Sequence, residues 1–178
     1  MDWLIRTYLP AFLELTLPVH AARVRSLAPI VDFPSARVAF TVGSAAWEAA
    51  SRLASDVTMQ SASGEVMEMT WDLATAAVGM TWPAARAAAR AAADVEEMLH
   101  MVRMATSLTA MVAARQSAMS TSDRAVAEYE AGGWTDPVSM ARREVWAAAK
   151  AALDPTLDAL QASMIELLWK MIDPRATA

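Results

Sequence analysis

The stretch from Thr81 to Met119 constrains the fold more than any other part of this chain, because it contains no glycine and no proline after Pro83. Its first half is a run of alanine that only Arg86 and Arg90 interrupt before position 94. Alanine has the highest intrinsic helix propensity, and proline is tolerated in the first turn of a helix. We therefore expect a helix that begins at Thr81 and continues to Met119, either as one long helix or as two helices that meet at a bend.

The hydrophobic pattern changes half-way along this stretch. On a helical wheel, Arg86, His100 and Arg115 share one polar face. Beyond His100, apolar residues such as Met104 and Met111 occupy that same side. Because a helix that is apolar on every side should be buried on every side, we predict a surface helix followed by the central helix of a bundle.

The rest of the chain predicts further helices and no β-sheet. Gly79 is placed to end one helix, Ser122 to cap the start of another, and Pro155 to occupy the first position of the last one. The segment Ile30–Phe33 is short and apolar, and we expect a buried connector there. The additional helices are expected at residues 2–16, 18–27, 34–54, 65–78, 123–131, 137–153 and 155–172. A kink is expected at Pro10.

The predicted fold class is all-α, a compact bundle of about seven or eight helices around a long central helix, forming one domain over residues 1–178. The hydrophobic fraction of 56% exceeds the usual ~45–50%, which indicates either a thick core or a surface covered in an oligomer, and we expect a homo-oligomer. The net charge of −5 argues against broad binding to nucleic acid. The absence of cysteine excludes disulfides and thiolate chemistry.

The sequence predicts a cytoplasmic bacterial protein without a transmembrane segment. No stretch approaches the ~18–20 uninterrupted apolar residues of a membrane span. The N-terminal region lacks the basic start and the cleavage site of a signal peptide. The abundance of alanine, with arginine strongly preferred over lysine, indicates a GC-rich bacterial coding sequence.

One pattern could hold a metal ion. Glu97 and His100 form an E-x-x-H unit, whose two side chains lie on the same face of a helix. Ferritin-like carboxylate proteins bind iron or manganese through such units, and Glu65 with Glu68 offers a second pair three residues apart. The ferritin-like pattern uses two E-x-x-H units, however, and only one is present. The alternative is a solvated face on which Glu96 pairs with His100.

The thirteen methionines and seven tryptophans form the second notable feature. Methionine adapts to varied ligands and partner helices, and tryptophan offers a large contact area with one N–H group. Packing in a shared core is the favoured explanation for these residues, but they could also line a surface that binds a hydrophobic small molecule or a protein partner. The candidate ligand-binding residues are Trp71, Met98, Met104, Met111 and Trp146.

No nucleophile motif and no glycine-rich phosphate loop is present. The sequence therefore favours a non-enzymatic helical-bundle protein with an immunity, adaptor or accessory role, and no cofactor. The alternative is a ferritin-like or related metal-dependent enzyme that uses Glu97 and His100, with iron or manganese as its cofactor. Catalytic residues cannot be assigned from the sequence.

Overall fold

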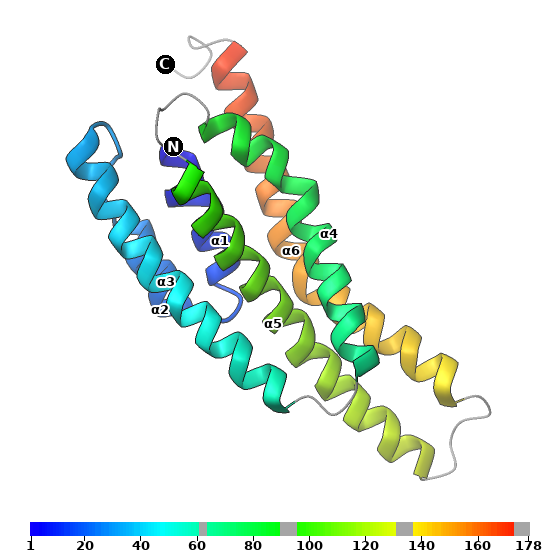
Figure 1. Cartoon of the computed structure of the whole chain (residues 1–178). Coiled ribbons are helices and arrows are strands. Elements are labelled where there is room, and N and C mark those ends of the chain that lie inside the picture. The colour runs from blue at the N-terminus through cyan, green and yellow to red at the C-terminus, as the bar shows by residue number, and fades with distance from the viewer. Residues whose placement is uncertain (61–63, 90–95, 131–136, 173–178) are drawn as a thin grey trace.

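The computed structural model describes residues 1–60, 64–89, 96–130 and 137–172 (Figure 1). Within these ranges the side chains of 58–60, 64–67, 84, 87–89, 125–130, 137–142 and 171 are not described. The described elements are the π-helix η1 (Leu4–Tyr8) and the α-helices α1 (Leu9–Leu13), α2 (Pro18–Arg25), α3 (Phe33–Gln60), α4 (Gly64–Ala89), α5 (Glu96–Glu130) and α6 (Pro137–Ile172). None of the described residues forms a strand, which confirms the all-α prediction.

The helix α5 packs against α3, α4 and α6, with α3 on one side of it and the other two on the opposite side (Figure 1). The N-terminal elements η1 and α1 pack against one another, against α2 and against the bundle. The seven consecutive residues from Thr109 to Arg115 are all buried, so α5 is enclosed on every side at this level.

The stretch that runs from Thr81 to Met119 belongs to two helices rather than to one. The first of them, α4, continues through both Gly79 and Pro83 and ends at Ala89, and α5 begins at Glu96. The prediction that a helix ends at Gly79 and another begins at Thr81 is therefore wrong. Packing explains the continuity, because buried residues occur on both sides of Gly79 along one face of α4, and that burial outweighs the weak helix propensity of a single glycine.

Gly79→Ala is expected to raise the free energy of unfolding by about 0.5–1 kcal/mol, measured by urea denaturation. Gly79 lies inside α4, and a Cβ atom added there would meet nothing within 4 Å. Gly43→Ala is the matched control, because its Cβ would lie 2.6 Å from the Met101 Cε atom, and the methionine would have to move. A loss of stability in Gly79→Ala would instead indicate that the helix ends at this glycine.

Three other predicted helix ends are absent. The helix α3 continues past Ser55 to Gln60, α5 continues through Ser122 to Glu130, and α6 continues through Pro155 to Ile172. Hydroxyl residues near these positions bond back to their own helix instead of capping a new one: Ser55 donates to the Ser51 carbonyl and Thr121 to the Ser117 carbonyl.

Pro155 lies inside α6, which changes direction part-way along its length (Figure 1). A proline inside a helix removes one hydrogen bond and displaces the preceding turn, so it bends the helix without ending it when both halves are held by packing. Leu153 and Leu157, on either side of the proline, are both buried. Pro10, near the start of the chain, has a different effect. The Leu9 N–H bonds to the Leu4 carbonyl in η1, a wide turn placed just before Pro10, which has no N–H to donate.

Candidate interaction surfaces

Three of the four residues proposed for a metal site are described by the structure, and they do not form a cluster. Glu68, Glu97 and His100 are exposed, and the side chain of Glu65 lies outside the described residues. Among the described residues, no three histidine or acidic side chains are grouped closely enough to hold a metal ion.

The position of Glu68 follows from the direction of the helices. The Tyr8 hydroxyl bonds to Thr81 in α4 and interacts with Thr106 in α5, so these two threonines lie at the same level. The two helices run in opposite directions (Figure 1). Glu68 and His100 therefore lie on opposite sides of that level, separated along the bundle by roughly 30 Å at 1.5 Å per residue. A shared metal ion cannot bridge such a distance.

The predicted ligand-binding residues divide between the core and the surface. Met98 and Met111 are buried in the core, and Met104 is half-buried. Trp71 and Trp146 are exposed, on α4 and α6 respectively. These five residues therefore do not line one surface, and the methionines of α5 serve mainly as core packing.

A cluster of buried hydroxyl groups lies where η1, α4 and α5 meet. The Tyr8 hydroxyl and Thr81 Oγ1 are 3.1 Å apart, and both residues are fully buried. The Tyr8 ring contacts the rings of Trp3, Phe12 and Trp82 at centroid distances of 5.8, 5.3 and 6.1 Å. Burial raises the pKa of Tyr8 from 10.0 to about 12, and the hydrogen bonds to the threonines offset part of this effect. The cluster fixes the N-terminal segment on the bundle.

Arg115 is fully buried, in contrast to the polar face on which the sequence places it. The same burial lowers the pKa of its guanidinium. The hydrophobic pattern cannot predict a buried arginine, because a single arginine on a helical wheel indicates a side of the helix that faces solvent. The preceding residues Thr109–Ala114, apolar apart from the threonine, are buried as well.

The prediction of a buried connector at Ile30–Phe33 is wrong from Val31 onward, whereas Ile30 is half-buried against the core. Val31 and Phe33 are 81% and 79% exposed, and Val38 in the next turn of α3 is also exposed. We refer to Val31, Phe33 and Val38 as the α3 corner. Leaving large apolar side chains in contact with water is unfavourable, and such residues grouped on one surface commonly mark an interaction site.

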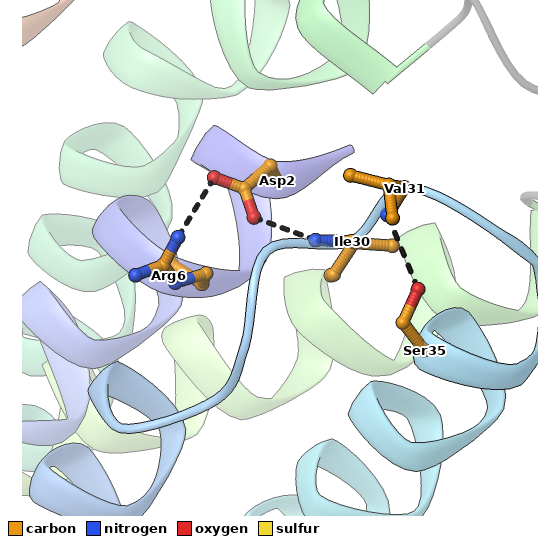
Figure 2. Close-up of polar contacts among 5 residues, drawn as sticks. All are labelled: Asp2, Arg6, Ile30, Val31 and Ser35. Atoms are coloured by element: carbon orange, nitrogen blue, oxygen red, sulfur yellow. Dashed lines mark hydrogen bonds and ion pairs between the residues drawn. The ribbon is translucent and has the colours of Figure 1, made fainter.

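Hydrogen bonds hold the backbone of the α3 corner in place (Figure 2). The Asp2 carboxylate accepts one bond from the Ile30 N–H at 3.0 Å and another from Arg6. The Val31 N–H donates to Ser35 Oγ at 3.1 Å. Polar groups at the N-terminus of the chain therefore anchor the connector from one side, and the first turn of α3 anchors it from the other.

The start of α3 has a reciprocal cap. The Asp32 carboxylate accepts a hydrogen bond from the Ser35 N–H at 2.8 Å, and Ser35 Oγ accepts one from the Asp32 N–H at 3.1 Å. Hydrogen bonds from Ser35 lower the pKa of Asp32, which keeps the capping carboxylate ionised. The two exposed apolar side chains that flank Asp32 are therefore presented on a fixed backbone.

A second exposed apolar surface lies at the end of α6. It is formed by Ile165, Leu168, Trp169 and Ile172, which we refer to as the α6 stripe. These residues follow the i, i+3, i+4, i+7 spacing that places side chains on one face of a helix. Each of them is more than half exposed, and Ile172 reaches 74%.

The orientation of the α6 stripe is set by a contact on the other side of the helix. Trp3 Nε1 donates to Ser163 Oγ at 2.9 Å, which turns Ser163 toward the N-terminal segment. At 100° per residue, the α6 stripe lies on the face opposite Ser163. Leu160, which precedes Ser163 by one turn, is buried. The stripe therefore points away from the bundle.

No protein-family model, no curated protein and no solved structure matches this chain. Across the part of the chain that the structure describes, no helix combines the length and the apolar character needed to cross a bilayer. The α3 corner and the α6 stripe are thus the surfaces from which a function can be derived.

Proposed function

We propose that this chain is a non-enzymatic, cytoplasmic bacterial protein with an adaptor or accessory role, which holds a segment of a protein partner on the α3 corner. One observation carries the proposal: Val31 and Phe33 stand about four-fifths exposed on a backbone that hydrogen bonds fix on both sides. A surface that is already ordered before binding loses less conformational entropy when the partner docks.

The shape of the α3 corner favours a protein partner over a small molecule. Small-molecule sites are concave and bury most of the surface of their ligand. Val31 and Phe33 are too exposed to form a concave site around a small ligand. A protein segment, which has an extended surface, can cover them. The buried positions of Met98 and Met111 remove the main support for a methionine-lined ligand site.

The chemistry of the partner segment follows from the charge beside the α3 corner. Arg37 lies between Phe33 and Val38 on the exposed side of α3, and it forms no ion pair within the described residues. Aromatic residues and arginine are the residue types that contribute most to binding energy in protein interfaces. We therefore propose an amphipathic partner segment whose apolar residues cover Phe33 and whose acidic residue pairs with Arg37.

The test is photo-crosslinking in the cells that naturally produce the protein. Benzophenone-alanine in place of Phe33 is expected to give one discrete adduct, and in place of Asp158, which is exposed on α6, none. Arg37→Glu should reduce the adduct roughly tenfold, since it reverses the charge that the acidic segment requires. The proposal fails if Phe33 gives no discrete adduct, or if the adduct is unaffected by Arg37→Glu.

A further inference from the structure

We infer that Asp2 is a positioning residue for the α3 corner, through which the docked N-terminal segment (residues 1–8) keeps Val31 and Phe33 in place for the partner. This inference rests on the proposed function and adds to it a residue that acts through the connector between α2 and α3. Three observations support it: the reach of the hydrogen bond from the connector to Asp2, the contrast in burial within the connector, and the attachment of the neighbouring Trp3 to α6.

One hydrogen bond joins the connector, residues 26–32, to a distant part of the chain (Figure 2). The Ile30 N–H donates to Asp2 Oδ1 at 3.0 Å, across 28 positions of sequence. Within the part of the chain that the structure describes, every other hydrogen bond of the connector joins residues three or four positions apart. Local bonds fix the shape of a turn but not its place on the molecule. The Asp2 carboxylate therefore fixes where the connector lies.

Burial changes sharply beside this bond. Ile30 is half-buried and packs against the core, whereas Val31, the next residue, is 81% exposed. An exposed valine gains free energy by leaving water, so an unanchored connector favours conformations in which Val31 turns back onto the protein. A hydrogen bond to a carboxylate is stronger than one between neutral groups. The bond to Asp2 thus holds the Ile30 backbone in the orientation that directs Val31 outward.

The position of Asp2 is itself set by the bundle. The next residue, Trp3, donates from Nε1 to Ser163 Oγ in α6 at 2.9 Å. The Trp3 ring also lies 5.8 Å from that of the buried Tyr8. Asp2 therefore joins two parts of the molecule: the bundle, through Trp3, and the connector, through its carboxylate. Loosening the N-terminal segment from the bundle also loosens the connector.

Arg6 supports the Asp2 carboxylate but does not position the connector. Arg6 Nη1 lies 3.4 Å from Asp2 Oδ2, whereas the Ile30 N–H bonds to the other oxygen. The Arg6 and Asp2 side chains are 32% and 45% exposed, and ion pairs accessible to water contribute little to stability. The hydrogen bond to Ile30 rather than the ion pair is therefore decisive, which makes Arg6→Gln a control for Asp2→Ala.

Amide hydrogen exchange of the full chain, followed by NMR, measures the positioning without the partner. In Asp2→Ala the Ile30 amide is expected to exchange at least about tenfold faster, because it has lost its acceptor. Asp2→Asn keeps an oxygen acceptor and should restore most of the protection. Arg6→Gln should exchange within about twofold of the wild type. Unchanged exchange of the buried Val112 amide shows in each variant that the bundle is intact.

A substitution in α6 tests the link between the bundle and the connector. Ser163→Ala removes the acceptor of the Trp3 Nε1–H and leaves Asp2 and the connector unaltered. The Ile30 amide is nevertheless expected to exchange roughly threefold faster, because the N-terminal segment is then held less firmly. Gln161→Ala, at an exposed position two residues away, is the matched control and should leave this exchange unchanged.

Photo-crosslinking measures the consequence for binding. With benzophenone-alanine in place of Phe33, Asp2→Ala is expected to reduce the adduct roughly three- to tenfold, since the partner must then order the connector as it docks. Asp2→Asn should leave the adduct near the wild-type amount. Asp158→Ala, which removes an exposed carboxylate from α6, should have no effect.

Two results would overturn the inference. The first is an Ile30 amide that exchanges at the wild-type rate in Asp2→Ala or in Ser163→Ala, and the second is an adduct that Asp2→Ala does not reduce. In either case the adduct of the chain with wild-type Asp2 would persist, and the proposed function would stand. Absence of that adduct is instead the failure of the proposed function, and the inference falls with it. The chain with wild-type Asp2 thus distinguishes the two failures.

Discussion

Tyr8→Ala is expected to lower the free energy of unfolding by about 3–5 kcal/mol, the usual cost of removing a large aromatic side chain from a packed core. Tyr8 is fully buried, and its ring contacts Trp3, Phe12 and Trp82. Those contacts join η1 and α1 to α4, so the substitution leaves a cavity at the point where the N-terminal segment meets the bundle. Urea denaturation followed by circular dichroism measures the loss.

Two control variants isolate the contribution of the buried Tyr8 ring to stability. One removes only the hydroxyl, and the other removes an aromatic residue at an exposed position. Tyr8→Phe keeps the ring and is expected to cost only about 1 kcal/mol, because Thr81 retains its bond to the Val78 carbonyl. Phe33→Ala removes an aromatic residue that is exposed, and its effect should stay within about 0.5 kcal/mol. Equal losses in Tyr8→Ala and Phe33→Ala would contradict the described packing of η1.

The sequence predicts the helical class well and the helix limits unevenly. The start of α2 at Pro18 and the start of α6 at Pro137 follow from proline in the first turn, and both predictions are confirmed. Gly79 and Pro155 are likewise expected at helix limits, yet they lie inside helices. Their propensities amount to about 1 kcal/mol for glycine and ~3 kcal/mol for proline, and tertiary packing of long helices can outweigh them.

The α6 stripe and the α3 corner could not be predicted from the sequence for a different reason. Leu157 and Leu168 lie three turns apart on nearly the same face of α6, yet Leu157 is buried and Leu168 is exposed. A hydrophobic pattern shows that both positions are apolar, but only the position of the helix in the bundle decides which part of that face the core covers. The exposure of Val31 and Phe33 was hidden in the same way, because a short apolar connector resembles a buried one.

The candidate metal residues show that a local pattern cannot predict which helices bring their side chains together. Glu97 and His100 lie three residues apart on one helix face, which the sequence states directly. Whether Glu68 joins them depends on the direction and level of α4 relative to α5. The contacts of the Tyr8 hydroxyl with Thr81 and Thr106 fix that level, and the bond to Thr81 links residues separated by 73 positions in the chain. No local pattern contains such information.

The stabilising effect of the Tyr8 hydroxyl is expected to reverse in alkaline solution. Burial raises the pKa of Tyr8 to about 12 in the folded protein, from an ordinary value of 10.0. Below pH 10 both states keep the proton, and the folded state retains the full benefit of the buried hydroxyl. Above pH 10 the unfolded chain releases its proton while folded Tyr8 keeps it, so stability falls by about 1.4 kcal/mol per pH unit until pH approaches 12.

The Tyr8→Phe variant has no ionisable proton at this position, so its free energy of unfolding does not show this alkaline decrease. The wild type should therefore be more stable than Tyr8→Phe by about 1 kcal/mol at pH 8, and less stable by about 1–2 kcal/mol near pH 12. Urea denaturation of both proteins at a series of pH values measures the crossing. A Tyr129→Phe background leaves Tyr8 as the sole tyrosine, so that absorbance can follow its ionisation. A stability difference that stays constant with pH would mean that the Tyr8 hydroxyl is open to solvent in the folded protein.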